Sequence, residues 1–165
     1  MVTKKGLIVT AIMLGAITTA SFFIWIFPQN RGSTVAVSDY GDEIESVRER
    51  HALIMDEMDS NLKSMLNNTL SPDDFVDRAQ ASSSQVTSLI SELIESNPSS
   101  EWRESYLSYD EALKKYNDYL TESISLASKI KSGISPSDMS DEMSKLTSLR
   151  NDTNSYIVMS NETKP

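Results

Sequence analysis

One feature limits what this chain can be: none of the 21 residues from Leu7 to Phe27 is charged. An α-helix rises about 1.5 Å per residue, so such a helix is roughly 30 Å long and matches the hydrocarbon core of a bilayer. Aromatic side chains gather in its second half, as they do at membrane boundaries, and Pro28 ends the run. We therefore predict a transmembrane helix over residues 7–27, in contact with membrane lipid.

The charges on either side of this run predict its orientation. Lys4 and Lys5 precede it, and every acidic residue lies at or beyond Asp39. Because basic residues favour the cytoplasmic side, residues 1–6 are expected to form a cytoplasmic tail and the rest of the chain to lie outside the cell membrane. Residues 28–38 show no periodicity and are interpreted as a stalk. The alternative is a cleaved secretory signal and a secreted protein, with a cut after Ala36.

Small residues repeat along one face of the predicted membrane helix, at Ala11, Gly15 and Thr19. Small side chains at this spacing allow two membrane helices to approach closely. Two interpretations are open. The residues form a packing face within the membrane, or they reflect the ordinary abundance of Ala, Gly and Thr in membrane helices.

Three dipeptides predict where later helices begin: Ser71-Pro72, Asn97-Pro98 and Ser135-Pro136. A Ser or Asn side chain accepts hydrogen bonds from the free backbone N–H groups of a helix start, and Pro fits the first helical position. Lys129 and Lys131 before Gly133 indicate the end of a helix. Together with apolar residues spaced three and four apart, these signals predict helices over residues 39–68, 72–96, 98–132 and 136–159.

Connections of a few residues make neighbouring helices antiparallel. The predicted fold is therefore all-α: a transmembrane helix followed by an antiparallel, up-down-up-down four-helix bundle of coiled-coil character over residues 39–160. Residues 161–165 are expected to form a polar tail. The alternative is a three-helix bundle with a loose fourth segment, because the chain after Met159 is polar.

Composition excludes several kinds of chemistry. The chain has no Cys, one His and five Gly, which leaves no thiolate nucleophile, no His-pair metal motif and no Gly-rich phosphate loop. Its net charge of −9 argues against a nucleic-acid partner. The acidic clusters lack the spacing of a calcium loop and are interpreted as solvated surface. We expect no catalytic residues, no metal site and no cofactor.

His51 and an aromatic stripe are the side chains that could carry function. His51 lies on the apolar face of its helix and is interpreted as a packed residue rather than a pH sensor or metal ligand. The stripe could line a cleft between helices or simply fill the core, with its last member beside the core face rather than on it. Its residues are Trp102, Tyr106, Tyr109, Tyr116 and Tyr119.

Three Asn-X-Thr triplets could accept a glycan if the outer part meets a glycosylation machinery. They begin at Asn67, Asn151 and Asn161, and two of them lie near predicted helix ends. Chance occurrence in a chain rich in Asn, Ser and Thr is the other explanation. A fourth candidate at Asn97 is excluded by Pro98.

Two functions fit these features. The first is a structural or interaction module, an accessory subunit that docks onto a protein partner of unknown identity or onto a second copy. The second is a small-molecule-binding module. In layout alone, residues 39–160 are similar to the four-helix ligand domains of microbial membrane receptors. The resemblance implies a ligand, but the sequence carries neither a second membrane span nor an output domain, so signalling would require a partner. Enzymatic activity is not expected.

Overall fold

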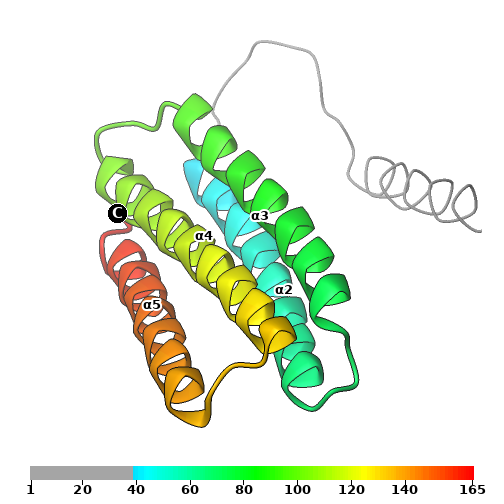
Figure 1. Ribbon diagram of the computed structural model, residues 1–165. Coiled ribbons are helices and arrows are strands. Elements are labelled where there is room, and N and C mark those ends of the chain that lie inside the picture. Colours follow the sequence, from blue (N-terminus) through cyan, green and yellow to red (C-terminus); the bar gives the residue numbers. More distant parts are fainter. Residues whose placement is uncertain (1–38) are drawn as a thin grey trace, which may run out of the picture. The chain divides into compact units, whose positions relative to one another are not determined.

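The computed structural model describes residues 39–165, which form four α-helices and no strand. The helices are α2 (Tyr40–Leu66), α3 (Pro72–Glu95), α4 (Arg103–Ser132) and α5 (Pro136–Glu162). Consecutive helices run in opposite directions, and α4 packs against each of the other three (Figure 1). The prediction of an all-helical bundle is confirmed for this part of the chain.

Two of the predicted helix starts are confirmed in atomic detail. The Ser71 hydroxyl accepts a hydrogen bond from the Asp74 backbone N–H at 3.1 Å, and Pro72 occupies the first helical position. Ser135 and Asp138 repeat this arrangement at 3.2 Å before Pro136. Each hydroxyl satisfies a backbone donor that has no partner inside its helix.

The helix start predicted at Asn97-Pro98 is wrong, because this dipeptide ends the preceding helix instead. Asn97 adopts a left-handed conformation (φ 46°) directly after the cap residue Ser96. Asn tolerates this conformation, and Pro commonly follows a helix end because it cannot continue the helix. The next helix, α4, begins only at Arg103, and its cap residue Trp102 makes no side-chain capping bond.

The C-terminal ends of α2, α3 and α5 differ from prediction by one to three residues. α2 ends at Leu66 instead of residue 68, because Asn68 adopts a left-handed conformation (φ 58°). α3 ends at Glu95 instead of residue 96. α4 ends as predicted, at a left-handed Gly133. α5 continues to Glu162, into the predicted polar tail. The polar end of α5 is helical because its side chains bond to α2 and α4, as described below.

The apolar faces of the helices meet in one core. Its largest fully buried side chains include Tyr109, Tyr116 and Leu120 from α4, Ile44 from α2 and Phe75 from α3. Helices of this length are stabilised mainly by burying such faces, because the abundant Ser residues favour helix only weakly. Because α4 contributes several of these side chains and packs against the other three helices, it forms the centre of the bundle.

α4 and α5 pack against each other extensively, and the side chains that α5 buries completely are mostly polar. α5 fully buries one large apolar side chain, Leu146, together with Thr153 and Ser160 at intervals of seven residues. Ser105 of α4 and Ser160 bond reciprocally, each hydroxyl donating to the other residue's backbone carbonyl at 2.7 Å. At the opposite end, Lys129 pairs with Glu142 at 2.8 Å. α5 thus belongs to the bundle over its length, and the alternative of a loose fourth segment is wrong.

The predicted membrane helix lies outside the residues that the structure describes, as do the stalk and the face formed by Ala11, Gly15 and Thr19. None of the four helices between residues 39 and 165 combines the length and apolarity that a membrane crossing requires. The anchor therefore stays a prediction from sequence.

Candidate functional site

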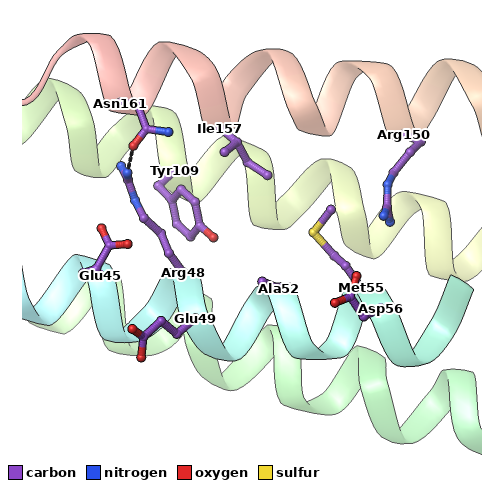
Figure 2. A pocket seen from close by; sticks show the side chains of 10 residues that line it. All are labelled: Glu45, Arg48, Glu49, Ala52, Met55, Asp56, Tyr109, Arg150, Ile157 and Asn161. Carbon is purple, nitrogen blue, oxygen red and sulfur yellow. Dashed lines mark hydrogen bonds between the residues drawn. The ribbon is translucent and has the colours of Figure 1, made fainter.

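A groove separates α2 from α5. Both helices pack on α4, but their own backbones do not come into close contact with each other. The groove has a volume of about 370 Å³ and is lined mainly by α2, with Tyr109 of α4 and three residues of α5 (Figure 2). Its lining residues are Glu45, Arg48, Glu49, Ala52, Met55, Asp56, Tyr109, Arg150, Ile157 and Asn161.

Arg48 closes one end of the groove. It extends from α2 to α5, where its guanidinium donates to the Asn161 side-chain oxygen and, at 2.5 Å, to the Ser160 hydroxyl (Figure 2). The guanidinium carbon lies 5.0 Å from the centre of the Tyr109 ring, within the range of a cation–π contact. Arg48 is only 8% exposed, and its Nε has no partner among residues 39–165.

Arg150 lies at the other end and reaches from α5 toward α2. Its Nη2 donates to Asp59 of α2 at 2.7 Å, and its guanidinium carbon lies 5.7 and 5.8 Å from the ring centres of Tyr116 and Tyr119. The side chain is 22% exposed, and its Nη1 has no partner within the described part of the chain. Each end of the groove thus holds a guanidinium, and each guanidinium has one buried nitrogen without a partner among residues 39–165.

His51 is fully buried and contacts Tyr109, which lines the groove. Its Nδ1 is 3.0 Å from the Tyr109 hydroxyl, and its ring meets the Tyr116 ring edge-on at a centroid distance of 4.8 Å. Burial, reinforced by the positive charge of Arg150, lowers the pKa of His51 to about 4. The imidazole is therefore neutral at pH 7, which fits its interpretation as a packed residue. Residues 39–165 contain no group of three side chains that could hold a metal ion.

The residues of the aromatic stripe differ in burial. Tyr106, Tyr109, Tyr116 and Tyr119 are buried, and Trp102 is partly exposed. Tyr119 was expected beside the core face, but it is buried because its ring stacks on Tyr116 at 5.4 Å. Tyr106 donates to the Tyr40 backbone carbonyl at 2.9 Å, away from the groove lining. Of the five residues, only Tyr109 lines the groove.

The three glycosylation triplets lie in different settings, all of them exposed at the Asn. Asn67 is the cap residue in the turn after α2, Asn151 lies within α5, and Asn161 is in the last turn of α5. The Asn161 side-chain oxygen is already occupied by Arg48. Glycosylation at these positions stays a prediction.

Sequence reasoning missed Arg48 and Arg150, although a signal for both was present. Arg48 follows Ile44 by four residues and precedes His51 by three, and Arg150 follows Leu146 by four and precedes Thr153 by three. Residues at these spacings share one helix face. A charged residue on an otherwise buried helix face indicates a polar or charged partner on a neighbouring helix, because buried charges require partners.

No protein-family model, no curated protein and no solved structure matches this chain.

Replacing Tyr109 by phenylalanine is expected to lower the free energy of unfolding by about 1–2 kcal/mol, because the buried His51 Nδ1 loses its hydrogen-bond partner. The measurement is urea unfolding of the full chain in detergent, followed by circular dichroism. Tyr116→Phe is the matched control, since its hydroxyl lies at a long 3.5 Å from the Ile54 carbonyl. Equal losses in the two variants would contradict a role for the His51–Tyr109 bond.

Proposed function

We propose that this chain is a membrane-anchored helical bundle outside the cell that binds a small organic molecule in the groove between α2 and α5. The observation that carries the proposal is the convergence of Arg48 and Arg150 on a groove whose middle is formed by Ala52, Ile157 and the Tyr109 ring. Ligand pockets combine apolar walls with a few well-placed polar groups in this way. The groove supports ligand binding, and we therefore put this function before the docking module that came first in the interpretation of the sequence.

The anchored topology rests on the uncharged run of residues 7–27 and on Lys4 and Lys5 before it. Under this proposal, a ligand signal passes to a partner protein. Protease applied to intact cells is expected to remove the bundle. A bundle that stays intact would contradict the topology, and release of the protein into the medium would support signal cleavage instead.

Filling the groove tests the proposal. Ala52 lines the groove and is exposed, so Ala52→Leu adds bulk there without disturbing the core, and leucine favours helix. A panel of organic acids, amines, amino acids and sugars is first tested by thermal unfolding of the full chain in detergent. We expect Ala52→Leu to weaken binding of any hit at least tenfold.

Ala81→Leu, at an exposed position of α3, is the matched control and should bind like the unmodified chain. A hit that binds Ala52→Leu normally would place the ligand outside the groove. A panel without hits would contradict ligand binding and favour the second candidate function.

The second candidate is a docking module, and exposed apolar side chains favour it. Ile94 of α3 is 66% exposed and Leu107 of α4 is 59% exposed. Together with Leu93 and Pro98 they line a hollow of about 330 Å³ at the α3–α4 connection. Exposed apolar surface of this kind is common at protein interfaces. Under this function, a stoichiometric protein partner co-purifies from detergent-solubilised native membranes.

A further inference from the structure

We infer that the groove between α2 and α5 binds a small zwitterion, an α-amino acid with an apolar side chain, whose charged head lies between Arg150 and Asp56. This inference rests on the proposed ligand-binding function and adds the chemical class of the ligand.

The carboxylate is assigned to the Arg150 end. Arg150 lines the groove and its side chain is 22% exposed; its Nη2 is bonded to Asp59, and its Nη1 is buried without a partner among residues 39–165, so the exposed part of the guanidinium is the part that a ligand can reach. A planar guanidinium presents several N–H donors and binds a carboxylate strongly. Arg48 closes the opposite end, where its guanidinium is already bonded to Asn161 and Ser160.

The ammonium group is assigned to the acidic side chains of α2. Asp56 lies at the same end of the groove as Arg150, and Glu49 lies further along the same helix (Figure 2). Neither forms an ion pair with any residue between 39 and 165, whereas Glu45 is paired with Lys164 at 3.2 Å. Asp56 is therefore free to accept a ligand cation beside Arg150, whereas Glu49 lies at the Arg48 end of the groove (Figure 2).

Charge balance selects a molecule that carries both charges. A simple carboxylate at Arg150 would face Asp56, and a simple amine at Asp56 would face Arg150. Unfavourable charge pairs of this kind discriminate strongly between ligands. A zwitterion satisfies both sides without adding net charge to the site.

The rest of the groove fits an apolar side chain. Ala52, Ile157 and the Tyr109 ring form its middle, between the charged ends (Figure 2). Its volume of about 370 Å³ lies near the lower limit for small-molecule pockets, which favours a ligand of amino-acid size.

Calorimetric titration of the full chain in detergent separates the two charged groups of the ligand. The probes are L-leucine, L-phenylalanine, 4-methylpentanoate, which is leucine without its amine, and 3-methylbutylamine, which is leucine without its carboxylate. We expect at least one amino acid to bind with a Kd below 1 mM, as weak small ligands do, and the acid and the amine to bind at least tenfold more weakly.

Substitution of the ammonium site provides the second readout. Asp56→Asn is expected to weaken amino-acid binding about tenfold or more and to leave 4-methylpentanoate binding unchanged or stronger. Asp77→Asn is the matched control, since Asp77 is an exposed, unpaired aspartate of α3 within the described residues.

The outcomes separate this inference from the function on which it rests. If the acid or the amine binds as tightly as the amino acid, the zwitterion is excluded and ligand binding stands. The same conclusion follows if other compounds of the panel bind, if Ala52→Leu weakens their binding, and if the amino acids do not bind. If no compound binds, both fail.

Discussion

Replacement of Tyr116 by alanine is expected to lower the free energy of unfolding by about 4 kcal/mol. Tyr116 is fully buried, and its ring contacts the His51 ring, the Tyr119 ring and the Arg150 guanidinium. Removing the ring leaves a cavity at the point where α2, α4 and α5 meet. The loss is measured by urea unfolding of the full chain in detergent, monitored by circular dichroism at 222 nm.

Tyr116→Phe separates packing from hydrogen bonding in this experiment. Phenylalanine keeps the ring and removes only the hydroxyl, which lies 3.5 Å from the Ile54 carbonyl. We expect a loss of less than about 1 kcal/mol. A small loss in the alanine variant would show that this part of the core collapses around the missing ring or is not packed as described.

Acid is expected to destabilise the bundle through His51 well before most carboxylates are protonated. The pKa of His51 falls from 6.5 to about 4 on folding, so between these pH values the unfolded chain binds more protons than the folded one. The contribution of His51 to the free energy of unfolding is therefore fully present above about pH 6.5, and it is lost as the pH is lowered toward 4. The loss between pH 7 and pH 5 is about 2 kcal/mol.

His51→Gln isolates this effect, because glutamine does not titrate. Its free energy of unfolding should change much less between pH 7 and pH 5 than that of the unmodified chain, even if the variant is less stable at both. Glu142 does not interfere in this range. Its bonds to Lys129 and Lys145 lower its pKa to about 2, and its stabilising effect is lost only as the pH falls from about 4.5 toward 2. Equal pH dependence in both chains would falsify the assignment to His51.

Local signals predicted the helices of residues 39–165 well, because each depends on neighbours in the chain. A serine that caps and a proline that follows it act within one turn, as at Ser71 and Ser135. Asn97-Pro98 failed because the same two residues suit the end of a helix as well as its start. Only the left-handed backbone of Asn97 distinguishes the two.

The groove could not be predicted in the same way, because it depends on how far α5 lies from α2. α5 buries few large apolar side chains, so its pattern indicated neither its partner nor its distance. Arg48 and Arg150 acquire their roles only when the two helices face each other across Tyr109. The aromatic stripe was the more visible sequence signal, yet most of it fills the core.

An even number of antiparallel helices returns the chain to the end of the bundle at which it entered. Lys164 near the C-terminus lies within 3.2 Å of Glu45 in the second turn of α2. A short linker could therefore join Pro165 to Asp39, and the chain could be reopened in the turn between α2 and α3, with every helix kept intact. We therefore expect the bundle of residues 39–165 to tolerate circular permutation, because its fold depends on which helices are neighbours and not on the order in which the chain connects them.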